Sequence, residues 1–234
     1  MSQSSNLGHL IDRQVSLWES KKGLQVERRG TLGHLPEGPW ITISTQLGAG
    51  GAELAAGLGA RLRWQVFDKE IVQEIAKSTN TREKVLSRLD GHAVGTFEDY
   101  VTHLFVPGNL GHSAYVLELM RVVWAIARQG QAIMLGRGAN WLLDPKYGLR
   151  VRAIAPLEKR VEWLMRTQAM SAADATRRVE EDNADRARFM RQVYKQDIDN
   201  PLGYDLVVNL GTLGVEPAVE IVVAALSSKL TAAE

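Results

Sequence analysis

Trp40-Ile-Thr-Ile-Ser-Thr-Gln-Leu-Gly-Ala-Gly-Gly-Ala-Glu-Leu-Ala55 is the most informative segment of this chain. A short run of apolar and β-branched residues, which suits a buried strand, is followed by a glycine-rich turn and an alanine-rich helix. Gly48, Gly50 and Gly51 permit positive φ angles and close approach of the backbone, and the free N–H groups at a helix N-terminus attract anions. The segment therefore predicts a phosphate-binding loop between a strand and a helix.

This segment matches the P-loop pattern G-x-x-x-x-G-K-[ST] only in part. Thr45 stands at the first glycine and Gly50 at the second, while Gly51 replaces the lysine and Ala52 replaces the hydroxyl residue. Two interpretations follow from the pattern alone. The glycines either form a phosphate loop that works without its lysine, or they form a tight turn in which they serve packing.

The overall composition is that of a globular domain. The 234 residues, of which 45% are hydrophobic and 24% charged, suffice for one core with at most a small subdomain. A formal net charge of +1 argues against binding to nucleic-acid polymers or membrane surfaces, and there is no long uncharged apolar run. Because cysteine is absent, no disulfide or thiolate site is expected, and we expect a cytoplasmic protein without a signal peptide.

Residues 1–38 are expected to form an appended helix and a linker. Apolar residues recur at helical spacing near the start of the chain, and a charged segment broken by glycines follows them. These apolar residues are Leu7, Leu10, Ile11, Val15, Leu17 and Trp18. Such a stripe packs either on the same domain or on a second copy of the chain, in which case the protein forms a homo-oligomer through this helix.

Two further apolar runs predict strands that end at the same edge of a sheet. Residues 61–67 lead to Asp68, and residues 131–135 lead to Arg137, which stands between two glycines. In open α/β folds, ligands bind where the carboxyl ends of parallel strands meet. Asp68 is accordingly a ligand at this edge, the N-cap of the next helix, or both. Arg137 is explained better as a clamp for phosphate or carboxylate than by packing.

Two other segments differ from this alternation of strands and helices. Residues 78–113 are punctuated by glycine and proline and are interpreted as an insertion. Three of the histidines fall there, but their spacing fits no ligand motif, so no metal site is predicted. A helix that begins near Ser171 carries Asp185-Arg-Ala-Arg188 directly after an acidic cluster. This charged run is either a solvated helix face or a device that brings positive charge over a polyphosphate.

Taken together, these features resemble the cytidylate kinase-like family of P-loop nucleoside monophosphate kinases, over about residues 40–230. The resemblance implies a three-layer α/β/α fold with a five-stranded parallel sheet in one domain, residues 39–234. Residues 78–113 would be the helical insertion that binds the acceptor, and residues 171–200 the lid. Five motifs carry the resemblance: Ile41-Thr-Ile-Ser-Thr-Gln-Leu-Gly-Ala-Gly-Gly51, Val66-Phe-Asp68, Leu135-Gly-Arg-Gly-Ala-Asn140, Asp185-Arg-Ala-Arg188 and Asp199-Asn-Pro-Leu-Gly-Tyr-Asp-Leu-Val-Val-Asn209.

The resemblance also implies which residues form the site. Asp68, Arg137 and Asp185 would bind the acceptor nucleotide. Arg137 would also act on the transferring phosphate, together with the lid residues Arg186 and Arg188. The loop would bind ATP through Ser44, Thr45, Gly48, Ala49, Gly50, Gly51, Ala52 and Glu53. Magnesium is expected as the second cofactor, without an identifiable protein ligand for it.

The implied reaction is transfer of the γ-phosphate of ATP to a nucleoside monophosphate, CMP or dCMP. Members of the family often carry glycine at the lysine position and arginines beside the loop, where this chain has Thr45 and Ala52. Loss of a cation at a transferring phosphate can cost several powers of ten in rate. A second interpretation is therefore a non-catalytic, nucleotide-binding or regulatory descendant of the family. The retained Arg137, Arg186 and Arg188 favour the enzyme, and the acceptor is not readable from the insertion.

Overall fold

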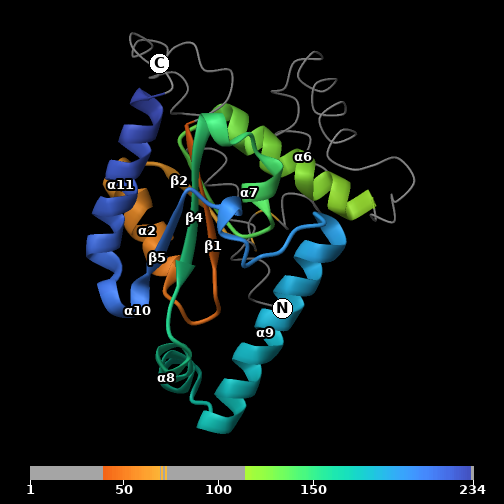
Figure 1. Ribbon diagram of the computed structural model, residues 1–234, viewed down its shortest axis with the longest axis vertical. Coiled ribbons are helices and arrows are strands. Elements are labelled where there is room, and N and C mark those ends of the chain that lie inside the picture. The colour runs from red at the N-terminus through yellow and green to blue at the C-terminus, as the bar shows by residue number, and fades with distance from the viewer. Residues whose placement is uncertain (1–38, 69, 71, 73–113, 233–234) are drawn as a thin grey trace, which may run out of the picture.

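A computed structural model describes residues 39–68, 70, 72 and 114–232 of the chain (Figure 1). The expected N-terminal helix in residues 1–38 and the expected insertion in residues 78–113 lie outside the described residues. Both therefore stay predictions, as does the proposed division of the chain into these segments.

A five-stranded sheet lies at the centre, with the strand order β2-β3-β1-β4-β5. Every neighbouring pair of strands is parallel. The strands are β1 (Trp40–Thr45), β2 (Gln65–Phe67), β3 (Ala132–Leu135), β4 (Gly148–Ile154) and β5 (Leu206–Asn209). Because β1 lies between β3 and β4, the loop that follows it emerges at the centre of the carboxyl edge, where the chain changes direction across the sheet. The predicted five-stranded parallel sheet is confirmed.

Helices cover both faces of this sheet and give the predicted three layers (Figure 1). Helices α2 and α11 pack on one face, and α6, α7 and the end of α9 pack on the other. The helices are α2 (Gly51–Leu62), α6 (Ala114–Gln129), α7 (Ala139–Leu142), α8 (Leu157–Gln168), α9 (Ala172–Val193), α10 (Leu210–Leu213) and α11 (Val215–Thr231), with short 3-10 turns at η2 (Pro145–Tyr147) and η3 (Pro201–Gly203). In the part of the chain that the structure describes, no helix is both long and apolar enough to cross a membrane.

The side chains of β1 explain why this strand is central. Ile41 and Ile43 are buried toward α2 and α11, while Trp40 is buried with α6 on the opposite face. Residues 40–43 of β1 are buried, Thr42 among them, whereas Ser44 and Thr45 at its carboxyl end are only partly buried. Burying each large apolar side chain of β1 stabilises the fold by roughly 1.5–3 kcal/mol, and this burial fixes the position of the loop that follows the strand.

The second strand is shorter than residues 61–67, which the sequence predicted. Helix α2 continues through Leu62 and ends with Arg63 in the left-handed conformation, so that β2 begins only at Gln65. Arginine and leucine are good helix formers, and the helix therefore extends into the first residues of the predicted strand.

Helices α8 and α9 extend beyond the carboxyl ends of the strands (Figure 1). They pack on each other through Leu164, Ala175 and Val179, with Leu47 of the glycine loop against the same cluster. The hydroxyl of Ser171 accepts a hydrogen bond from the Asp174 N–H at 3.1 Å and caps α9. The charged run of the sequence is thus part of one long helix, which contacts Leu47 of the glycine loop.

Candidate functional site

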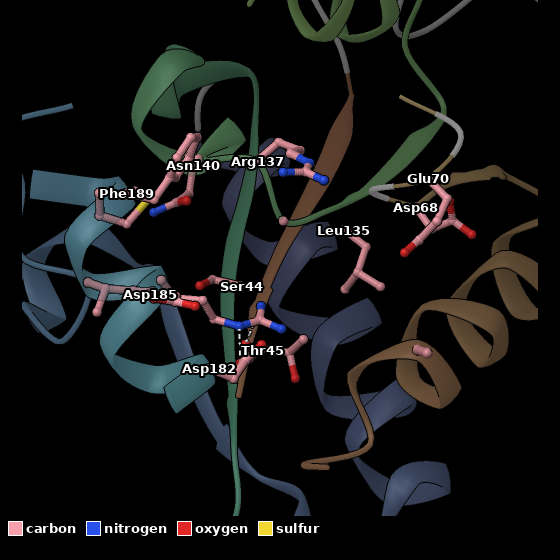
Figure 2. Close-up of a pocket in the computed structure, with 16 residues that line it drawn as sticks. Ser44, Thr45, Asp68, Glu70, Leu135, Arg137, Asn140, Asp182, Asp185 and Phe189 are labelled. Carbon is pink, nitrogen blue, oxygen red and sulfur yellow. Dashed lines mark hydrogen bonds and ion pairs between the residues drawn. The ribbon is translucent and has the colours of Figure 1, made fainter. Parts of the chain in front are cut away.

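A cavity of about 460 Å³ lies between the carboxyl ends of β1 and β3 and helix α9 (Figure 2). Residues from five separate parts of the chain line it. The parallel strands β1, β2 and β3 end at this edge, and α9 crosses over it. The predicted site residues that it brings together are Ser44, Thr45, Ala52, Asp68, Arg137, Asp185 and Arg186. Asp68 and Arg137, which come from different strands, therefore do share one cavity, as expected from their place at the sheet edge.

A second cavity, of about 590 Å³, lies on the other side of the glycine loop. It is bounded by α8 and by the start of α10. Of the predicted residues it is lined by Gly48, Ala49, Gly50 and Glu53. The predicted loop residues thus divide between two cavities, with the loop itself between them.

Arg188 is not among the residues that line either cavity. Its guanidinium donates to the Asp185 carboxylate at 3.1 Å, and 64% of its side chain is exposed. The neighbouring Arg186 faces the loop, because residues 186 and 188 point in different directions on a helix. Gly51 is also outside both linings and is the buried first residue of α2.

Glycine is required at two positions of the loop by its geometry. Gly48 and Gly50 have φ angles of +77° and +87°, which side chains rarely adopt. A Cβ atom at Gly48 would also lie 2.8 Å from the carbonyl oxygen of Arg160, so α8 leaves no room for one. Gly50 is the N-cap of α2 and provides no side-chain cap for the N–H groups of the first turn. Those groups suit an anion.

Thr45 occupies the space that a loop lysine would need. A Cβ atom built on Gly51 would overlap the Oγ1 and Cβ atoms of Thr45. Threonine at the first glycine position and glycine at the lysine position are therefore complementary in packing. The two departures from the P-loop pattern amount to one structural change.

The turn after β3 holds Arg137 in a strained conformation. Arg137 has a φ angle of +57°, and its carbonyl oxygen accepts a hydrogen bond from the Tyr194 hydroxyl at 2.7 Å. Burial raises the pKa of Tyr194, which keeps this hydroxyl protonated. A Cβ atom at Gly138 would overlap the Tyr194 ring. The positive φ angle of Arg137 costs of the order of 1–3 kcal/mol, and such strain is typical of functional sites.

The guanidinium of Arg137 forms no close ion pair with the described residues, although the negative charge of Glu70 acts to raise its pKa. Its Nε is buried without a hydrogen-bond partner, and burial lowers the pKa of the group. In Figure 2 the guanidinium points toward the side of the cavity where Asp68 and Glu70 lie. A buried cation is costly unless it is paired. Arg137 is therefore suited to bind an anion that enters this cavity.

Arg186 connects α9 to the glycine loop. Its Nη1 donates to the carbonyl oxygen of Thr45 at 3.1 Å, and its Nε donates to the Asp182 carboxylate, which lies beside the dashed lines in Figure 2. One charge-assisted pair and one main-chain contact thus hold the guanidinium at the mouth of the loop.

Arg152 of β4 is a site residue that the sequence did not reveal. It is 6% exposed, and its guanidinium donates to Ser44 Oγ at 2.8 Å and to Asp199 at 3.0 Å. Ser44 Oγ accepts from Arg152, and the Tyr204 hydroxyl, 3.5 Å away, donates to the Ile198 carbonyl at 2.6 Å. The hydrogen of Ser44 is therefore available to the Tyr204 oxygen or to the cavity. The available indication was the alternation of arginine with apolar residues in a buried strand, where charge needs a partner.

The described residues offer few ligands for magnesium. Ala52 has no hydroxyl, and the described part of the chain contains no group of three His, Cys, Asp or Glu residues that could hold a metal ion. Ser44, Thr45 and Asp68 are oxygen donors that line the first cavity. Magnesium often keeps several waters and binds through substrate phosphates with only one or two protein oxygens. These three residues are sufficient to provide one or two such oxygens.

The model of the cytidylate kinase-like family matches residues 40–212. The chain belongs to this family. The match confirms the resemblance found in the sequence, and it spans β1, the glycine loop, the first cavity and helix α9.

Two curated relatives match shorter parts of the chain. A cytidylate kinase of Methanocaldococcus jannaschii is 30% identical over 106 residues, which are 44% of this chain and 60% of that protein. A uronate isomerase of Corynebacterium glutamicum is 35% identical over 92 residues, which are 39% of this chain and 18% of that protein. This chain therefore covers less than two thirds of either relative.

A solved structure supports the fold. The crystal structure of an uncharacterized protein of Eubacterium ventriosum matches with a TM-score of 0.64 over 81% of this chain and 98% of that chain, at 17% identity. At this level of identity the similarity concerns the fold alone.

We expect Gly50→Val to abolish ATP binding while the protein still folds. Valine at a φ angle of +87° costs about 1–2 kcal/mol, or roughly 2–8 °C in melting temperature, and it displaces the N–H groups that face the phosphate. Gly130→Val is the control, since Gly130 has a φ angle of +71° and lies before β3, far from the loop. Calorimetric titration with ATP on both folded variants tests this, and unchanged ATP affinity in Gly50→Val would refute it.

We expect Gly51→Lys alone to destabilise the protein by about 1–3 kcal/mol through overpacking against Thr45. In the double variant Thr45→Gly, Gly51→Lys the space is open, so part of this loss should be recovered. Denaturant unfolding of both single variants and the double variant gives the coupling free energy, which we expect to be about 1–3 kcal/mol in favour of the double variant. Additive effects would mean that Thr45 is not the obstacle.

Proposed function

We propose that the protein transfers the γ-phosphate of ATP to a nucleoside monophosphate, with CMP or dCMP as the acceptor. The observation that carries the proposal is the guanidinium of Arg137, which forms no close ion pair with the described residues, has an unpartnered Nε and shares a cavity with Asp68 and Arg186. A phosphate would give this guanidinium a directly paired anion, and family membership favours a nucleotide as the source of that phosphate. The M. jannaschii relative is described as a cytidylate kinase, which suggests the base.

In this proposal the two cavities hold two different substrates. The loop N–H groups and the cavity of Gly48 and Gly50 take the phosphates of ATP, and the cavity of Arg137, Asp68 and Asp185 takes the acceptor. Phosphoryl transfer requires chiefly that two phosphates are held in line, neutralised and shielded from water. Magnesium would be held by oxygen donors such as Ser44, Thr45 and Asp68 and would supply positive charge to the phosphates.

The arginines of α9 act on the transferring phosphate in this scheme. Phosphate oxygens would replace the Asp182 carboxylate as the partner of Arg186, which already lies at the loop carbonyl of Thr45. Arg188, exposed and paired with Asp185, would join the site when α9 moves over bound substrates. Ser44, which accepts from Arg152, would donate its hydrogen to an anionic oxygen.

A second candidate function is nucleotide binding without catalysis. It is favoured by the packing of Thr45 against Gly51, which excludes a lysine from the loop, and by Ala52 in place of the magnesium-binding hydroxyl. A regulatory protein of this kind would bind ATP or a monophosphate and form no product.

Formation of nucleoside diphosphate from ATP and CMP, dCMP, UMP or AMP, with and without magnesium, separates the two functions. We expect turnover with CMP or dCMP, and Arg137→Met should lower kcat/KM for the acceptor about 10²–10³-fold, because it removes a preorganised cation. Melting temperature should be unchanged or higher in this variant, since a buried and uncompensated charge is lost. Arg177→Met, which alters an arginine that is 67% exposed on α9, is the control. No diphosphate from any acceptor, with nucleotide still bound, would favour the second function.

Removal of both Arg186 and Arg188 should lower kcat far more than it raises KM for either substrate. Both groups meet the phosphate chiefly in the transition state, and each such contact is worth on the order of 2–4 kcal/mol, or roughly 30- to 1,000-fold in rate. Steady-state kinetics of Arg186→Ala, Arg188→Ala and the double variant measure this against Arg177→Ala. A double variant that turns over like the natural protein would remove both residues from the mechanism.

A further inference from the structure

Arg160 lies where the first turn of α8 meets the glycine loop. The two segments approach closely through their backbones, since a Cβ atom at Gly48 would lie 2.8 Å from the Arg160 carbonyl oxygen and 3.1 Å from its Cα. Only 5% of Arg160 is exposed. A long cationic side chain is thus buried directly beside the loop that lacks a cation.

The charge of Arg160 is not balanced by a carboxylate among the described residues. Its Nη1 donates to Asn183 Oδ1 at 3.1 Å, a neutral partner, and its Nε is buried without a hydrogen bond. Burial lowers the pKa of Arg160, and the positive charge of Arg152 lowers it further, whereas Asp182 opposes these effects. Asp182 is already paired with Arg186. The folded protein therefore carries a guanidinium whose surroundings disfavour its charge.

Arg160 lines neither cavity, but its neighbours on two sides do. Gly48, which its backbone touches, lines the cavity on the α8 side of the loop. Asp182, the neighbour of its partner Asn183, lines the cavity under α9. An anion that binds along the loop between these cavities would come close to this group.

We infer that Arg160 binds the donor polyphosphate and supplies from α8 the positive charge that the loop lacks. The inference rests on the proposed function, because it assigns the phosphates of the donor to the glycine loop. Thr45 closes the lysine position at Gly51, so the cation must reach the phosphate from outside the loop. A bound phosphate would give the Nε of Arg160 an acceptor and its charge a counter-ion.

The test compares ligand-free stability with affinity for inorganic tripolyphosphate, which needs neither a base nor turnover. Arg160→Met keeps the length of the side chain and removes its charge. We expect its melting temperature without ligand to equal or exceed that of the natural protein, because an unbalanced buried charge is gone. Its dissociation constant for tripolyphosphate should rise at least about tenfold, the effect of one lost charge-assisted contact.

Two further variants are controls for the charge at position 160 and for loss of an arginine elsewhere. Arg160→Lys keeps the charge and should bind tripolyphosphate at least about fivefold more tightly than Arg160→Met. Arg177→Met removes a charge from the exposed, Asp174-paired arginine of α9 and should change neither quantity.

The opposite pattern identifies a structural role. If Arg160→Met fails to fold, or is less stable with unchanged tripolyphosphate affinity, Arg160 serves to hold α8 against α9 and the inference is overturned. Equal affinities of the Lys and Met variants, or no tripolyphosphate binding by the natural protein, overturn it as well. Failure of the proposed kinase function is recognised separately, as absence of nucleoside diphosphate from a protein that still binds tripolyphosphate through Arg160.

Discussion

The contact between Thr45 and Gly51 governs the chemistry of the site, because it leaves no space for a cation inside the glycine loop. The surrounding elements instead bring arginines toward the loop and its cavities. These are Arg137 from the turn after β3, Arg152 from β4, Arg160 from α8 and Arg186 from α9. The parallel sheet makes this possible, since β3, β1 and β4 lie side by side and end at the same edge.

This arrangement of arginines lowers the stability of the ligand-free folded protein. A lysine on a loop is solvated until a ligand arrives, whereas Arg152 and Arg160 are almost fully buried. Arg152 is compensated by Ser44 and Asp199, but Arg137 and Arg160 each retain a buried Nε without a partner in the described part of the chain. Together with the strained φ angle of Arg137, these groups lower stability in a way that an anion would relieve.

The sequence predicted the sheet, the glycine loop and the meeting of Asp68 with Arg137, because alternating strands and helices determine which ends share an edge. It predicted less well where α2 ends, since Arg61 and Leu62 suit a helix as well as a strand. It did not reveal Arg160, which is one basic residue among several in an amphipathic helix and is distinguished by its burial and its contact with Gly48. Nor did it show that Thr45 and Gly51 depend on each other, because packing between residues six apart in a turn follows from three-dimensional geometry.

Helix α9 is attached to the loop through a main-chain oxygen. Arg186 donates to the carbonyl of Thr45, an acceptor that every amino acid provides, so this attachment does not depend on which side chain stands at position 45. Selection could therefore exchange that side chain, and with it the packing beneath the loop, without detaching α9. A different side chain at position 45 would therefore leave the hydrogen bond between α9 and the loop in place.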